Sequence, residues 1–233
     1  MLQVECECRH GKMLTSNLTV GSGTCILCAS QHPPSSLTST LAAHTMRIKL
    51  DVEKAIQAIG VILREEGKVA TRLRILKLLY IADRQALQAS GTPILASKLV
   101  AMKHGPLHSE VLDLINGKHP DEPKWSHYFS NQGRNIKLAE EPGVGKLSRF
   151  EIDILSQAVK DRLMRDDWCV ADETHSFEEW IKNYPCPNEN TSRPIPIESV
   201  IDAVGRGSDK EEILRDLQTT DAFDRFFSTE VGR

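Results

Sequence analysis

Residues 71–91, TRLRILKLLYIADRQALQASG, decide the fold of this chain. Apolar side chains recur through this stretch at the three- and four-residue spacing of an amphipathic α-helix. The positions available for packing are Leu73, Leu76, Leu79, Tyr80 and Leu87. Gly91 follows Ser90, and glycine readily takes the left-handed conformation that ends a helix. We therefore predict a long helix from about Thr71 to Ser90.

A second helix is predicted immediately before this one. Asp51 is a residue type that caps helix N-termini, and Gly67 ends the element. Between them one face is apolar, with Ala55, Ile56, Ile59, Ile62 and Leu63. The two helices should form a pair joined by a short connection.

The residues after Gly91 interrupt the helical pattern. Residues 92–103, TPILASKLVAMK, are short and bounded by proline and glycine, which favours a small strand or hairpin. Pro106 stands where a further helix would have its first residue, and Asn116-Gly117 would end that helix. Residues 120–142 are rich in loop-forming types, with short strands expected at Tyr128-Phe129 and at residues 136–138.

Three later segments have the form of a capping box, in which a serine and a glutamate satisfy the free N–H groups of a helix start. They begin at Ser148, Ser176 and Ser208. The expected fold is therefore mainly α: a compact helical domain at residues 46–190 with a small β-hairpin or short sheet, followed by a C-terminal helical tail at residues 191–233.

Composition excludes several classes of function. The chain has 233 residues, with 29 basic and 32 acidic side chains and a net charge of -3, so bulk attraction to nucleic acid or anionic lipid is not expected. No apolar run reaches the roughly 18 residues of a membrane span, and no signal peptide pattern opens the chain. We expect a cytoplasmic protein that uses no cofactor.

Residues 1–45 differ from the rest, because they combine clustered cysteines with a Ser/Thr/Pro-rich stretch and lack an apolar period. Cys6, Cys8, Cys25 and Cys28 supply the four thiolates of a structural zinc site, and His10 could replace one of them. An extension or linker that is disordered, or is a gene-model artefact before a start at Met46, explains the same residues. We expect a chain beginning at Met46 to keep the melting temperature of the longer one.

Three pieces of sequence, taken in order and spacing, resemble the Panacea domain family, the SocA-like antitoxins. They are KLLYIADR at 77–84, GTPI at 91–94 and VAMKHGP at 100–106. Trp125, the helix start at Ser148, and Thr174-His175 followed by Trp180 also resemble landmarks of that family. The resemblance covers about residues 50–185. It implies a mostly helical domain with a small sheet, no established catalysis, and a cognate toxin as partner.

The polar landmarks have a structural and a functional interpretation. In the structural one, Gly105 supplies an unusual dihedral, Pro106 starts a helix, and His104 lies in the turn. In the functional one, Asp83, His104 and His175 converge in one polar cluster, since a carboxylate beside an imidazole fixes its charge and tautomer. Asp83 could also buttress the following loop. Trp125 and Trp180 are interpreted first as packing residues.

Other functions fit the sequence less well than binding of a toxin. No activated nucleophile, phosphate loop or catalytic metal motif is present, so an enzyme is not expected. One branch of the resembling family delivers its toxin to the ClpXP protease, which makes a AAA+ protease an alternative partner. A winged-helix-like DNA-binding interpretation would use Arg64, Lys68, Arg72, Arg74 and Lys77 as phosphate contacts. We predict an antitoxin-type protein-interaction module.

Overall fold

The computed structural model describes residues 50–184 and 191–219. The chain divides into two units, residues 1–45 and residues 46–233, and all the described residues belong to the second. The predictions for the first 45 residues, and for a start at Met46, lie outside the described residues.

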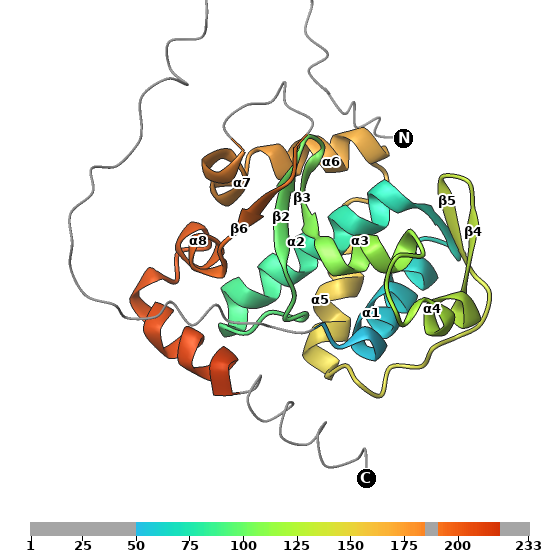
Figure 1. Cartoon of the computed structure of the whole chain (residues 1–233), viewed down its shortest axis with the longest axis horizontal. Coiled ribbons are helices and arrows are strands. Elements are labelled where there is room, and N and C mark those ends of the chain that lie inside the picture. Colours follow the sequence, from blue (N-terminus) through green and yellow to red (C-terminus); the bar gives the residue numbers. More distant parts are fainter. Residues whose placement is uncertain (1–49, 185–190, 220–233) are drawn as a thin grey trace, which may run out of the picture. The chain divides into compact units, whose positions relative to one another are not determined.

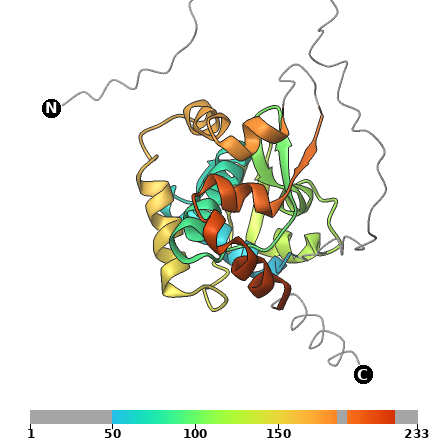
Figure 2. The same cartoon turned by 90° about the vertical axis from the view of Figure 1, so that its left-hand side faces the viewer.

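Three helices form the centre of the fold (Figures 1 and 2): α1 (Val52–Glu65), α2 (Arg72–Ser90) and α5 (Arg149–Lys160). The Asp51 side chain accepts from the N–H of Lys54 at the start of α1, as predicted. Thr71 caps α2, and Gly91 ends it in the left-handed region with φ 78°. Ser148 and Glu151 form the predicted capping box at the start of α5.

The other described helices are short. They are α3 (Ser109–Ile115), α4 (Glu122–Tyr128), α6 (Asp167–His175), α7 (Glu178–Asn183), α8 (Ile197–Ala203) and the 3-10 helix η2 (Gly207–Asp209). Residues 210–219 are also helical. The predicted fold class, mainly α with a small sheet, is confirmed.

Six short strands form two antiparallel three-stranded sheets in the described part of the chain. One has the order β1 (Val69–Thr71), β5 (Asn135–Leu138), β4 (Phe129–Gln132), and the other β3 (Gly105–His108), β2 (Leu99–Met102), β6 (Arg193–Ile195). The β2–β3 hairpin confirms the predicted β element, with Leu99 opposite His108 and Met102 opposite Gly105. On its other edge, β2 pairs with β6, a strand that the sequence did not predict.

Three local predictions were wrong. Pro106 does not start a helix: it lies in β3 opposite Ala101, and a proline is tolerated there because β3 is an edge strand. Residues 122–128 are helical although a loop was expected. Ser176 caps no helix start, because Ser176 ends α6 and its hydroxyl donates to the carbonyl of Glu173.

The core contains two apolar clusters on either side of α2. The larger joins α1, α2 and α5 with Trp125 and Phe129, whose rings lie 4.2 Å apart. The smaller joins Tyr80 of α2 with β6 and with Ile201 of α8, which is fully buried. The first residues of the segment predicted as a helical tail therefore complete a sheet and a core.

We predict that Ile201→Ala lowers the free energy of unfolding by about 2–5 kcal/mol, the usual cost of truncating a fully buried isoleucine. Ile181→Ala is the matched control, because Ile181 is 54 % exposed and its truncation should cost less than about 0.5 kcal/mol. Urea unfolding of both variants provides the measurement. Equal stabilities would mean that α8 is not part of the folded core.

Candidate functional site

A row of polar side chains winds around α2, the central helix. Arg74, Lys77, Tyr80 and Asp83 follow one another at intervals of three residues, so successive members lie about one turn apart. Each of the four is almost fully buried. Buried polar groups must find hydrogen-bond partners. Each member of this row therefore fixes a different neighbouring element.

Lys77 holds the β2–β3 hairpin against α2. Its Nζ atom donates to the carbonyl of Pro106 at 2.7 Å, and its side chain is 0 % exposed. Burial lowers the pKa of Lys77 from 10.5 to about 7, because a charged amine loses its hydration there. The side chain therefore acts mainly as a hydrogen-bond donor to the strand.

The turn of the hairpin requires Gly105. Its φ is +92°, and a Cβ at this position would approach Lys77 Nζ to 2.9 Å and would also collide with the hydroxyl of Thr174. The hairpin can therefore pack closely on both α2 and α6 only if this residue is glycine. The predicted role of Gly105, an unusual dihedral, is confirmed.

Two aromatic side chains hold the hairpin from the other side. Trp180 donates from Nε1 to the carbonyl of Met102 at 2.9 Å, and its ring stacks on His175 with centroids 4.5 Å apart. Burial lowers the pKa of His175 below its usual value, partly offset by the nearby Asp172 carboxylate. Trp180 thus has a structural role, as the sequence predicted.

Asp83 anchors the loop that leads into β2. It accepts from the N–H of Leu95 at 2.7 Å, which is the predicted buttress. Its other oxygen lies 4.0 Å from Nε2 of His108, whose Nδ1 is 2.7 Å from the Ser97 hydroxyl. Burial raises the pKa of Asp83 to about 7 and lowers the pKa of His108 to about 3, so burial favours the neutral form of each group.

Two further buried groups of α2 reach α7 and the α5–α6 loop. The Tyr80 hydroxyl donates to Glu179 at 3.1 Å, and burial raises the pKa of Tyr80 well above its usual value. Arg84 also donates to Glu179. Arg74 donates to Glu66 and to the carbonyls of Arg162 and Arg165. The charged guanidinium of Arg74 therefore orders the approach to α6.

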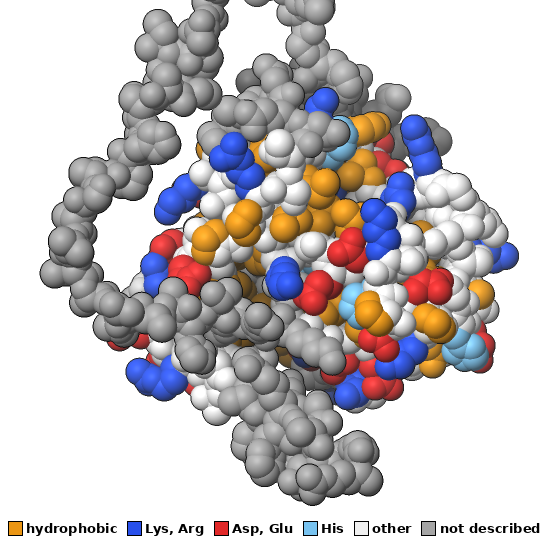
Figure 3. Space-filling view, viewed as in Figure 1, with side chains coloured by type: hydrophobic (Ala, Val, Ile, Leu, Met, Phe, Trp, Pro, Cys, Tyr) orange, Lys and Arg blue, Asp and Glu red, His pale blue; other side chains and the backbone are white. Residues whose placement is uncertain are grey.

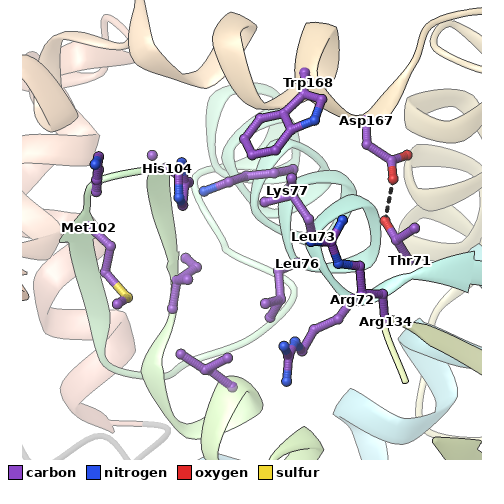
Figure 4. A pocket seen from close by; sticks show the side chains of 14 residues that line it. Thr71, Arg72, Leu73, Leu76, Lys77, Met102, His104, Arg134, Asp167 and Trp168 are labelled. Atoms are coloured by element: carbon purple, nitrogen blue, oxygen red, sulfur yellow. Dashed lines mark hydrogen bonds between the residues drawn. The ribbon is translucent and has the colours of Figure 1, made fainter. Parts of the chain in front are cut away.

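An open pocket of about 420 Å³ lies beside this buried network (Figure 4). Apolar side chains contributed by α2, β2, β3, α3 and α6 line it: Leu73, Leu76, Met102, Leu107, Leu112 and Trp168. The polar lining is Thr71, Arg72, Lys77, Lys103, His104, Arg134 and Asp167. His104 is exposed and meets the Trp168 ring edge-on, with centroids 5.3 Å apart.

The structure divides the predicted polar cluster. His104 and His175 are neighbours, because a Cβ on Gly105, the residue after His104, would lie 3.3 Å from the His175 ring. The imidazole beside Asp83 is a different one, that of His108 in β3. Trp125 is buried in the core, away from the pocket lining.

Sequence reasoning missed Lys77 and His108 as central buried groups and Trp168 as an exposed one. A signal for Lys77 was present, since this lysine interrupts an apolar run of α2 between Leu76 and Leu78. His108 and Trp168 carried no comparable signal, because their burial depends on which elements pack against them.

Metal ligands do not gather in the described part of the chain. Across residues 50–184 and 191–219, no group of three or more His, Cys, Asp and Glu side chains could hold an ion. Cys6, Cys8, Cys25, Cys28 and His10 lie outside these ranges, so the zinc site stays a prediction. None of the described helices is long and apolar enough to cross a bilayer.

The fold and the site define a mainly helical domain in which buried polar side chains fix a hairpin beside an open, basic-rimmed pocket. Residues 75–181 match a family model described as "Antitoxin SocA-like, Panacea domain". The resemblance predicted from the sequence is confirmed for this stretch, which is similar to SocA-like Panacea domains. Searches of curated proteins and of solved structures found no match.

The raised pKa of Asp83 predicts a pH dependence of stability. Between about pH 4 and pH 7 the folded chain binds more protons at this carboxyl than the unfolded chain does, so its contribution to the free energy of unfolding falls as pH rises. Asp83→Asn keeps an acceptor for the Leu95 N–H and removes this titration. Relative to wild type, the variant should gain roughly 2 kcal/mol between pH 5 and pH 8.

Urea unfolding of both proteins at several pH values measures this difference. Glu151→Gln is a useful comparison, because burial, opposed by hydrogen bonds from Lys54 and Ser148, leaves the pKa of Glu151 lowered rather than raised. Its stability relative to wild type should therefore fall only as pH rises toward about 4.5, and should stay constant between pH 5 and pH 8. Parallel stability curves for wild type and Asp83→Asn would show that the Asp83 carboxyl titrates normally.

Proposed function

We propose that the chain is an antitoxin-type interaction module that neutralises a cognate toxin in the cytoplasm by binding it directly. The observation that carries this proposal is the match of residues 75–181 to the SocA-like Panacea family. The toxin is expected to be the product of a neighbouring gene. No cofactor and no catalytic step take part in the proposed role.

The contacts of the polar residues support binding over catalysis. Lys77 is the amine with the most depressed pKa of those described, yet it is fully buried and its Nζ is bonded to the carbonyl of Pro106. The carboxyl of Asp83 is likewise buried against the N–H of Leu95. Both groups are engaged in holding the fold: Lys77 lines the pocket but has no exposed surface, and Asp83 is not among the lining residues. A general acid or base would need to reach a substrate in the pocket.

The burial of α2 also weighs against the DNA-binding alternative. That interpretation used Arg74 and Lys77 as phosphate contacts, but Arg74 is 5 % exposed and Lys77 is 0 % exposed. Arg64, a third proposed contact, is paired with Glu141 at 2.8 Å. Phosphate binding would require these cations at the surface.

Co-expression with the neighbouring gene product tests the proposal. The product alone should stop growth, and the chain should restore growth and form a complex with it from purified components. Rescue should persist in cells that lack a ClpXP-type protease, because binding alone neutralises the toxin. Loss of rescue in those cells would favour the adaptor alternative, and rescue without a purified complex would contradict direct binding.

The same assay separates binding from catalysis. His175→Gln removes proton transfer at a histidine with a lowered pKa while keeping much of its bulk and hydrogen bonding. Rescue should persist at wild-type level if the variant melts within a few degrees of wild type. A folded His175→Gln variant that loses a measurable turnover by about a hundredfold or more would instead indicate an enzyme.

A further inference from the structure

We infer that the pocket bounded by α2, the β2–β3 turn, the β4–β5 turn and α6 is where the toxin docks, through a segment that carries both apolar and acidic side chains. We call it the hairpin pocket, and its lining is that described above. The inference rests on the proposed antitoxin function and names the surface that performs it.

The shape and lining of the hairpin pocket suit a few side chains of a protein segment. Its volume of about 420 Å³ accommodates a few side chains, and its floor is formed by leucines of α2, β3 and α3. Trp168 stands at its edge with 53 % of its surface exposed. An exposed tryptophan beside an apolar hollow is the residue type that most often contributes strongly to protein–protein binding.

The charges of the hairpin pocket select an acidic occupant. Among the residues that the structure describes, the side chains of Lys103 and Arg134 have no hydrogen-bonding or ion-pair partner, and Arg72 is bonded only to the neutral amide of Asn116. The one lining carboxylate, Asp167, accepts from the Thr71 hydroxyl and lies 3.8 Å from Arg74. The rim is thus positive although the chain carries a net charge of -3.

The rim is also held rigid before any partner binds. Lys103 and His104 project from a turn whose flanking residues are fixed by the Trp180 bond to Met102 and the Lys77 bond to Pro106. A preformed surface avoids the entropy cost of ordering on binding. Figure 3 shows hydrophobic side chains gathered on the face that carries β2, β3 and α6, with Lys and Arg side chains beside them.

A protein segment fits these features better than a small anion does. The apolar surface is not confined to the pocket. Trp168 is half exposed at its edge, and Met164, in the loop that leads into α6, is 95 % exposed. A small anion would leave this apolar surface in water, whereas an amphipathic segment would cover it.

Binding measurements with the full-length chain and the neighbouring-gene toxin test the inference. Trp168→Ala should weaken binding about 30-fold or more. The double variant Lys103→Glu/Arg134→Glu should slow association about tenfold and reduce its dependence on salt, because the attraction to acidic side chains is reversed. Both variants should melt within a few degrees of wild type, since all three side chains are exposed.

Two variants on α7 serve as matched controls. Ile181 is 54 % exposed, nearly the same as Trp168, and Lys182 is an exposed lysine, and neither lines the hairpin pocket. Ile181→Ala and Lys182→Glu should bind within about twofold of wild type. Wild-type affinity in the pocket variants, or an equal loss in the α7 variants, would overturn the inference while leaving the antitoxin proposal intact. Absence of binding by wild type itself would overturn both.

Discussion

The hydrogen bond from Lys77 Nζ to the carbonyl of Pro106 is the contact on which the rest of the domain depends. It joins the N-terminal half of α2 to the second residue of β3, and the amine that makes it is fully buried. The close approach leaves no room for a Cβ at Gly105. This contact therefore explains why a lysine lies in an apolar stretch of α2 and why a glycine follows His104.

The other buried polar groups of α2 extend the same arrangement. Arg74 orders the loop before α6, Tyr80 meets Glu179 of α7, and Asp83 holds the loop before β2. Removing one partner of such a buried pair leaves the other unsatisfied, which typically costs about 1–3 kcal/mol. The elements around α2 are thus fixed relative to one another, and the hairpin pocket is a surface of that rigid body.

Much of this fold followed from local sequence. The caps Asp51, Thr71 and Ser148 and the left-handed Gly91 act within one helical turn, so their residue types were sufficient to place α1, α2 and α5. The helix starts predicted at Pro106 and Ser176 were wrong because proline also occurs in edge strands and serine also occurs at helix ends. Which of these uses applies depends on the elements that pack nearby, and local sequence does not specify it. His104 and His175 lie near each other as predicted, but the imidazole beside Asp83 is that of His108, which is set by how β3 lies along α2.

Direct titration of Lys77 tests the central claim, that this side chain is a buried link between α2 and the hairpin whose burial disfavours the charged form. NMR of a chain labelled at the lysine Cε and Nζ positions would follow it, with Lys77→Met identifying the resonance. The structure predicts a midpoint near a pKa of about 7 and exchange of the Nζ protons that is slower than at the exposed lysines. A midpoint close to 10.5, with protons exchanging as fast as those of Lys103, would contradict the account.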